Sequence, residues 1–487
     1  MTDDTVSRTT RGAEATDRAG IDVVSSAASA AEWFPASHGQ RRLWILSQMD
    51  SAVDAYVISS ALRLRGPIQA DAIRSSLEQI CARHDVLRTY LQMVDGQLRQ
   101  YVNVQVALPW VESDVSDSAD PLVDCQAALR RDAEQPFDLG QAPLWRVRLC
   151  RLSDDDWVLG LNVHHVAADA WSLELIQQEL AVMYQAEMAG TRPMLPTPTT
   201  RYGEIAAEQQ GALGADLLAQ AKQFWRDKFR DLPPRVSPLP DVSVRRRALP
   251  AAGVMRRDID DMRTDALRGL ASMHDASLFM ALAALVDLLL YRHCGERDVT
   301  IGTPVSGRVG RDQETLVGLF MNLVALRVVV DPNQGFSSLL NSVASASIAA
   351  LEHQRYPFDV LVEDLALTRD AASAPLFDVL VALQNVNLAD AVVAGIRVGE
   401  FELGATTAKY DLVFEFAEHD GGLVFNLTYN ADLYGAETIE RLGAHFERLL
   451  EAVIVNPDRP LREIAMLSRA ERRQLNTWSG GASAYPR

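Results

Sequence analysis

Two adjacent histidines followed by an aspartate, His164, His165 and Asp169, form the pattern H-H-x-x-x-D, which occurs once in the chain. Histidine changes its protonation state near neutral pH, so it is well suited to accept a proton in a transfer reaction. Taken singly, each residue has an ordinary structural role: a satisfied histidine at a strand end, or an aspartate that caps a helix. Together they favour a catalytic role, and the rest of the chain decides between the catalytic and the structural interpretation.

The residues around this pattern predict a strand, a tight connection and a helix. Residues 157–163 form a short and mostly apolar run, as in a buried strand. Adjacent side chains at a strand end point to opposite sides, so one histidine can face a cavity while the other packs inward. A helix is expected to begin near Trp171, with Asp169 at its cap and Trp171 in the core. Its apolar positions recur at helical spacing: Leu173, Ile176, Leu180, Met183 and Tyr184.

Length and charge limit the class of protein. A chain of 487 residues is too long for one compact core, so two lobes are expected. Hydrophobic residues make up 48% of the chain, which suits a soluble globular protein. The net charge of -18 argues against nucleic acid and anionic membranes as partners.

The cysteines and the first residues indicate the compartment. The chain opens with polar, acidic residues that lack the pattern of a signal peptide. The cysteines show neither C-x-x-C spacing nor companion histidines, so we expect no metal site and no disulfide framework. A cytoplasmic location follows from this cysteine usage. The four are Cys81, Cys125, Cys150 and Cys294.

Strand-like and helix-like segments alternate in both halves, which predicts the α/β class. Residues 1–31 are poor in large apolar groups and are expected to be a disordered tail. Residues 191–201, rich in Pro and Thr, are the predicted linker between a first lobe, residues 32–190, and a second lobe, residues 202–474. The most apolar helix runs from 277 to 291; Asp287 interrupts it, so we expect a core helix rather than a membrane span.

Three arginines are candidates for holding the site. Residues 301–308 follow a strand-like segment, and two glycines and a proline make them a stiff loop that can aim Arg308. Arg83 and Arg88 lie in a charged turn before a predicted strand. A structural salt-bridge cluster is the expected role of these two.

Taken in order, the motifs resemble those of a condensation domain of a non-ribosomal peptide synthetase. That family is related to chloramphenicol acetyltransferase. The resemblance implies two acetyltransferase-like lobes in a V-shaped pseudo-dimer with a tunnel between them. It also implies donor and acceptor carrier proteins that insert phosphopantetheine arms, with no cofactor bound by the domain itself. The matching segments are 37–44, 83–90, 164–172, 202–209, 301–308 with 320–322, 353–361, and 375–385.

The resemblance also implies roles for the site residues. His165 would face the reaction centre, either as a general base or as a group that positions the amine, and both roles stay open. His164 would pack and support the loop, and Asp169 would pair with Arg308. The oxyanion or substrate region would lie at the helix start, near the backbone N–H groups of Ala170, Trp171 and Ser172.

The two ends of the chain imply further partners. Residues 475–487 resemble the opening of an adenylation domain, so a downstream adenylation domain is expected. The tail, residues 1–31, is a candidate docking segment for an upstream synthetase subunit. The sequence departs from the family at Ala170, where glycine is usual. It also departs in the segments around 202–209 and 372–373.

Two alternatives stay open beside amide formation. Ester formation with a hydroxyl acceptor would use the same fold and the same histidines. A non-catalytic platform that recruits a tailoring enzyme is the second, although such relatives often lack the second histidine, and this chain keeps His165. Epimerization is disfavoured because Trp171 precedes Ser172, and heterocyclization because the two histidines are not aspartates.

Overall fold

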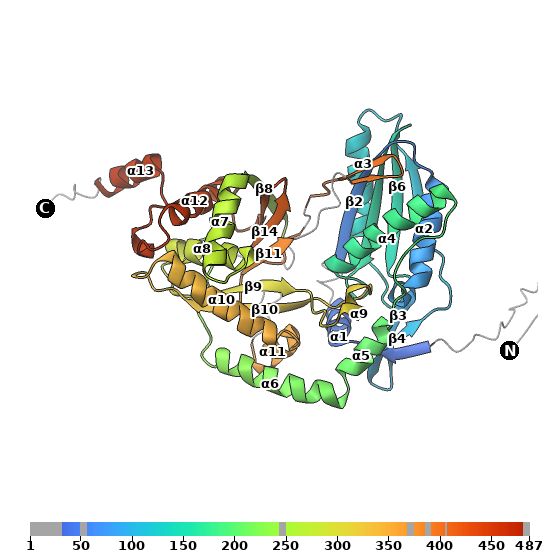
Figure 1. Cartoon of the computed structure of the whole chain (residues 1–487), viewed down its shortest axis with the longest axis horizontal. Helices are drawn as coiled ribbons and strands as arrows, with labels where there is room; N and C mark the ends of the chain where they lie inside the picture. Colours follow the sequence, from blue (N-terminus) through green and yellow to red (C-terminus); the bar gives the residue numbers. More distant parts are fainter. Residues whose placement is uncertain are drawn as a thin grey trace, which may run out of the picture.

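The chain folds into two lobes that lie side by side (Figure 1), as seen in a computed structural model. The structure describes residues 32–48, 56–242, 250–367, 375–384, 391–404 and 407–480. The predicted tail of residues 1–31, the departure at 372–373 and the last seven residues lie outside the described residues. Each lobe is built on a six-stranded mixed sheet, so the class is α/β, as predicted.

The sheet of the first lobe has the order β12-β13-β2-β7-β6-β5. Helices α2 (Ala70–Arg83) and α4 (Ala170–Ala189) pack against each other over the larger core, and α3 (Pro121–Glu134) packs on β6, β7 and β2 over a smaller one. Buried residues run through most of β7, which places this strand in the centre of the sheet. The strands are β2 (Val57–Arg65), β5 (Trp110–Asp114), β6 (Trp145–Ser153), β7 (Asp156–His164), β12 (Ala391–Val393) and β13 (Ile396–Glu400).

The sheet of the second lobe has the order β10-β9-β11-β14-β15-β8. Its core is the largest of the described chain, and helix α8 (Leu278–Cys294), capped by Ser277, is buried in it as the predicted core helix. The strands are β8 (Ala252–Ile259), β9 (Asp298–Val305), β10 (Asn322–Val329), β11 (Val379–Gln384), β14 (Leu412–His419) and β15 (Gly422–Asn430). The other helices are α7 (Asp261–Met273), α9 (Arg311–Glu314), α10 (Phe336–Glu352), α11 (Phe358–Asp364), α12 (Ala436–Val455) and α13 (Arg469–Gly480).

The chain crosses between the lobes more often than a single linker at 191–201 implies. Strands β12 and β13 fall within residues 202–474, yet β13 pairs with β2 in the sheet of the first lobe. Leu316 and Phe320 likewise pack into the first lobe's core. The predicted second lobe is therefore not a contiguous structural unit, because two of its segments complete the first lobe (Figure 1).

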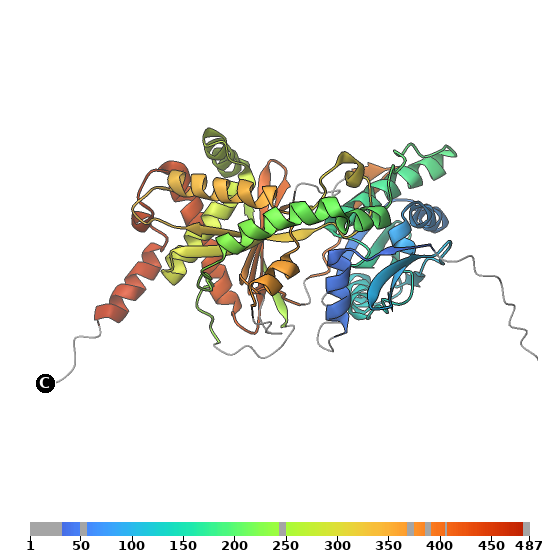
Figure 2. The same ribbon diagram turned by 90° about the horizontal axis from the view of Figure 1, so that it is seen from below.

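Smaller elements connect the lobes along one side. Helix α5 (Tyr202–Gln209) packs on β1 (Glu32–Pro35), which belongs to a three-stranded sheet of order β1-β4-β3. Helix α6 (Ala212–Lys228) continues from α5 and reaches the second lobe (Figure 2), where Lys222 pairs with Asp364 at 2.7 Å. The remaining elements are α1 (His38–Ser47), β3 (Thr89–Val94), β4 (Gln97–Val102) and the short helices Asp85–Arg88 and Leu461–Glu463.

Two further properties of the described chain concern its cysteines and its most apolar helices. The four cysteines are free, and Cys294 alone among them is not fully buried. Among the described residues no single helix has the length and hydropathy of a membrane span. Helices α7 and α8 have the required length and hydropathy only when taken together, and they meet at an angle of 100°.

Asp287 is an unusual residue of the second core, and it leads to a prediction about stability. Its side chain is fully buried, and neither carboxylate oxygen has a hydrogen-bond partner among the described residues. Burial raises the pKa of this carboxyl well above its usual range, because an unpaired charge is poorly solvated there. The pKa of Asp287 is higher in the folded chain than in the unfolded chain. The contribution of the protonated carboxyl to the free energy of unfolding is therefore fully present below about pH 4 and is lost as the pH rises toward the folded pKa.

Replacing Asp287 with leucine is expected to raise the free energy of unfolding at neutral pH by about 1–3 kcal/mol, since it removes an unsatisfied buried polar group. Asp287→Asn is the matched control: it removes the titration but keeps a buried polar group, so its gain should be smaller. Urea unfolding at acidic and at neutral pH measures both effects. A leucine variant that is less stable than the wild type at neutral pH would contradict this account.

Candidate active site

His165 lies at the end of β7, where the two lobes meet. Its backbone N–H donates to the carbonyl oxygen of Tyr56, at 2.8 Å, next to the start of β2. The side chain is half-buried, and its Nδ1 atom is buried without a hydrogen-bond partner among the described residues. Burial lowers the pKa of His165 well below its usual value, and nearby cations lower it further. The imidazole is therefore neutral at physiological pH and has a lone pair for a proton.

His164 points to the other side of the strand end and is almost fully buried. Its Nδ1 accepts a hydrogen bond from the backbone N–H of Val166 at 3.1 Å, and its ring contacts Phe137 edge to face. Burial, and then the charge of Lys409, lower the pKa of His164 to about 4. These contacts fit the predicted role in packing and in support of the loop.

The segment that begins at Ser37 holds the histidine loop from the other side. Ser37 caps α1 in a reciprocal capping box with Gln40, which fixes the start of this helix. The buried Gln40 side chain then donates to the carbonyl oxygen of Val166 at 3.1 Å, directly after the two histidines. Ser37 Oγ also lies 2.8 Å from the Tyr202 hydroxyl, which donates to the carbonyl oxygen of Leu319.

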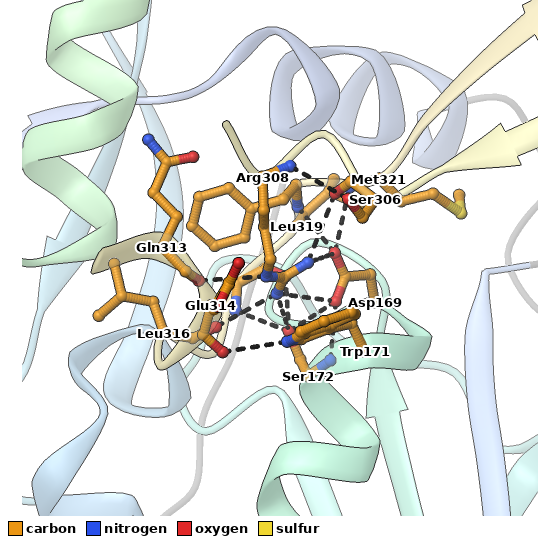
Figure 3. A network of polar contacts seen from close by, with 12 residues as sticks. Asp169, Trp171, Ser172, Ser306, Arg308, Gln313, Glu314, Leu316, Leu319 and Met321 are labelled. Carbon is orange, nitrogen blue, oxygen red and sulfur yellow. Dashed lines mark hydrogen bonds and ion pairs between the residues drawn. The ribbon is translucent and has the colours of Figure 1, made fainter. Parts of the chain in front are cut away.

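Asp169 is the centre of a buried polar network between the lobes (Figure 3). It caps α4 by accepting from the backbone N–H of Ser172 at 2.9 Å, as predicted. Its carboxylate also accepts from the backbone N–H groups of Phe320 and Met321, at 3.0 Å and 3.1 Å. The predicted ion pair with Arg308 is present: the guanidinium donates to both carboxylate oxygens, at 2.7 Å and 3.1 Å. All of these contacts come from hydrogen-bond donors, which fits the predicted role of Asp169 in stabilising the site.

Arg308 is aimed at Asp169 by the loop that leaves β9. The strand extends to Val305, so only the residues from 306 onward form the stiff loop that was predicted to begin at 301. Gly307 has φ +66, and a Cβ there would lie 2.0 Å from the carbonyl oxygen of Phe320, so only glycine fits. Both side chains of the ion pair are almost fully buried, and the guanidinium also lies over the Phe320 ring at 4.3 Å.

The residues at the start of α4 differ in part from prediction. Trp171, predicted to be core, is 43% exposed, because its indole lies over the lobe interface and donates to the carbonyl oxygen of Glu314 at 3.0 Å. Ser172 is fully buried; its N–H and hydroxyl donate to Asp169, so neither is available to an oxyanion. Ala170 is the first helical residue, so alanine in place of the usual glycine brings no backbone strain.

Arg83 and Arg88 lie away from the histidines and support the elements that hold them. Arg83 donates to Glu179 of α4 at 2.9 Å, and His84 contacts the other oxygen of the same carboxylate at 2.8 Å. Arg88 pairs with Asp85 and donates to backbone carbonyl groups of the turn. Both therefore belong to salt-bridge clusters, as the sequence indicated.

Four residues near His165 were not singled out from the sequence. Lys409 and Arg42 act on the pKa of His165 as nearby positive charges, although they come from opposite lobes. Arg42 in turn acts on the pKa values of Asp359 and Tyr410. Arg42 falls inside a matching segment of the sequence, whereas nothing in the local sequence around Lys409 indicates that it approaches the histidines.

The chain matches a known protein family over most of its length. A model of the family described as the condensation domain matches residues 30–476, which is most of the chain. The chain belongs to the condensation-domain family. The relatives are non-ribosomal peptide synthetases and related enzymes, and the chain spans only a small part of the first few of them.

Two relatives illustrate the relation of this condensation domain to longer proteins. Tyrocidine synthase 3 from Brevibacillus parabrevis is 32% identical over 448 residues, which is 92% of this chain but 7% of the relative. Phosphinothricin tripeptide synthetase PhsC from Streptomyces viridochromogenes is 33% identical over 460 residues, which is 93% of this chain and 42% of the relative.

Solved structures share the fold of this condensation domain. The X-domain in its complex with OxyB from teicoplanin biosynthesis is 25% identical, with a TM-score of 0.79 over 94% of this chain and 99% of that chain. The first condensation domain of the calcium-dependent antibiotic synthetase, bound to a substrate analogue, is 22% identical, with a TM-score of 0.77 over 90% of this chain and 100% of that chain. The two-lobed fold is therefore that of chloramphenicol acetyltransferase-like condensation domains.

Proposed function

We propose that this condensation domain is an acyltransferase that joins a donor acyl or peptidyl thioester to the amine of an acceptor aminoacyl thioester. The observation that carries the proposal is the place of His165 directly after β7, with an Nδ1 atom that has no hydrogen-bond partner among the described residues. Burial also lowers the pKa of this imidazole, which favours its neutral form. Retention of His165 favours this reaction over a platform that only recruits another enzyme.

The proposed reaction needs little activation of the leaving group. The acceptor nitrogen attacks the thioester carbon, a C–N bond forms, the C–S bond breaks, and the proton from nitrogen ends on the thiolate. His165 either takes this proton as a general base, a role that is typically worth about 10² to 10⁴ in rate, or accepts a hydrogen bond that orients the amine. Asp169 and Arg308 hold the loop and take no part in the proton transfer. Of the predicted oxyanion region, the N–H groups of Ala170 and Trp171 remain as candidates.

Positioning is the larger part of the proposed catalysis. Two tethered substrates that enter from opposite sides meet at one point, so the encounter becomes effectively intramolecular, and this can supply several kcal/mol. The substrates would be carried on phosphopantetheine arms of donor and acceptor carrier proteins. The multidomain nature of the relatives supports these partners and a downstream adenylation domain. A cytoplasmic location is part of the proposal. A docking role for residues 1–31 is part of the proposal.

A competition between acceptors tests the function. A donor carrier loaded with an acyl group is mixed with this domain and with an acceptor carrier that bears either an amino acid or the matching hydroxy acid. We expect transfer to the amine acceptor, read as a gain in the intact mass of the acceptor carrier. The product that mild base releases from the carrier thioester should keep the donor acyl group on its nitrogen, because an amide resists those conditions. Transfer to the hydroxyl acceptor alone would assign ester formation instead. Carrier binding without transfer to either acceptor would favour the recruitment role.

A further inference from the structure

Lys409 extends from the second lobe to the residue that holds His165. Its Nζ atom lies 4.8 Å from the ring centroid of Tyr56 in the first lobe. The carbonyl oxygen of Tyr56 accepts the backbone N–H of His165 at 2.8 Å. A cation–π contact between the lobes therefore places a positive charge beside the proposed reaction centre.

The backbone on both sides of Lys409 is fixed, so the position of this charge is defined. The N–H of Ala408 donates to the carbonyl oxygen of Pro250 at 2.9 Å, and Ala408 is buried. The ring of Tyr410 stacks on Phe377, with centroids 5.8 Å apart. The Lys409 side chain leaves this anchored segment and crosses to the other lobe.

The other charged groups around His165 do not cancel Lys409. Arg42, from α1, adds a second positive charge, and His164 is neutral. The carboxylate of Asp169, four residues along, is already paired with Arg308. Asp359 of α11 lies within reach of the Arg42 charge, and burial raises the pKa of this carboxyl, which weakens it as a counter-charge to Arg42.

We propose that Lys409 is a positioning residue for the transfer reaction. Its ammonium group, held against the Tyr56 ring, disfavours a positive charge on the His165 imidazole and on the attacking amine. The inference rests on the proposed function and names a residue whose charge adds to the effect of burial on the protonation of the site. Lys409 is exposed at the protein surface as a residue, but partial removal of solvent around its ammonium, and then Arg42, lower its pKa to about 8. The influence of Lys409 therefore fades above that pH, as the ammonium loses its proton.

The first test follows His165 directly and needs no turnover. Histidine Cε1 signals are titrated by NMR in the wild type, in Lys409→Met and in Lys409→Arg, with His165→Ala to assign the signal. A like charge nearby disfavours the protonated imidazole, so we expect the His165 titration in Lys409→Met to move upward by about one pH unit. Lys409→Arg keeps the charge and should follow the wild type. An unchanged titration in a folded Lys409→Met variant would overturn the inference.

The second test follows transfer at saturating carriers as a function of pH. The acceptor α-amine has an ordinary pKa of about 8, so its deprotonated fraction limits the rate in acid. We expect Lys409→Met to be slower than wild type by about tenfold near pH 6 and equal to it above about pH 9. A ratio that is constant across the pH range would indicate a structural role and contradict the inference. Thermal unfolding checks each variant, and Lys409→Gln replaces a methionine variant that fails to fold.

The two tests separate the inference from the proposed function. If the wild type transfers nothing, the proposed function fails, while the His165 titration still decides whether Lys409 acts on the imidazole. If the wild type transfers and the titration is insensitive to Lys409, the function stands and the inference fails.

Discussion

Replacing His165 with alanine is expected to slow amide formation by about 10² to 10⁴, the range that a general acid–base group contributes. The fold should survive, because the side chain is half-buried and its Nδ1 makes no hydrogen bond to the described residues. Single-turnover transfer between loaded carriers measures the effect, and thermal unfolding confirms that the variant is folded.

His419→Ala is the matched control for this variant. His419 ends β14 in the second lobe, and its side chain is exposed beside Asp420. The same substitution there should leave the transfer rate unchanged. If His165→Ala transfers as fast as His419→Ala, the imidazole has no chemical role, and binding of the two arms in one place would account for the whole rate.

Asp169→Asn is expected to destabilise the protein by about 3–5 kcal/mol, the cost of leaving one partner of a buried ion pair unpaired. Arg308 would keep its charge, almost fully buried, without a counter-ion. The network also holds the backbone of Phe320 and Met321 against α4, so the contact between the lobes should loosen. Chemical unfolding and the yield of soluble protein measure the effect.

Asp260→Asn provides a matched control with the same local chemistry at the surface. Asp260 caps α7 by accepting from the backbone N–H of Arg263 at 2.8 Å, and it pairs with the Arg263 side chain. Because Asp260 is exposed to solvent, the substitution should cost much less stability there than at Asp169. A soluble Asp169→Asn variant of wild-type stability that loses only transfer would contradict the structural role and assign Asp169 to the chemistry.

Local sequence signals predicted much of the site. An apolar run followed by a helical pattern located β7 and α4, and Asp169 at their junction is the cap that such a junction favours. The glycines around Arg308 correctly indicated a stiff loop, because φ +66 at Gly307 is a local requirement of the backbone. The identity of its partner, Asp169, came from the family resemblance, since no local pattern specifies a contact between distant segments.

Features that depend on contacts between distant segments were missed. Strands β12 and β13 are short, and nothing in their composition indicates that β13 pairs with β2 instead of with a strand of the second lobe. Trp171 was assigned to the core by its type, whereas its indole hydrogen-bonds across the lobe interface and stays 43% exposed. The approach of Lys409 to Tyr56 depends on the same interface.

The most direct test of the central claim is the mass of the acceptor's phosphopantetheine arm after incubation with a loaded donor carrier and the wild-type domain. The proposed function predicts that the acceptor arm gains the mass of the donor acyl group, joined to the acceptor amino acid through an amide bond, while the donor arm returns to a free thiol. An acceptor arm of unchanged mass, with donor and acceptor carriers both loaded and the domain folded, would contradict it.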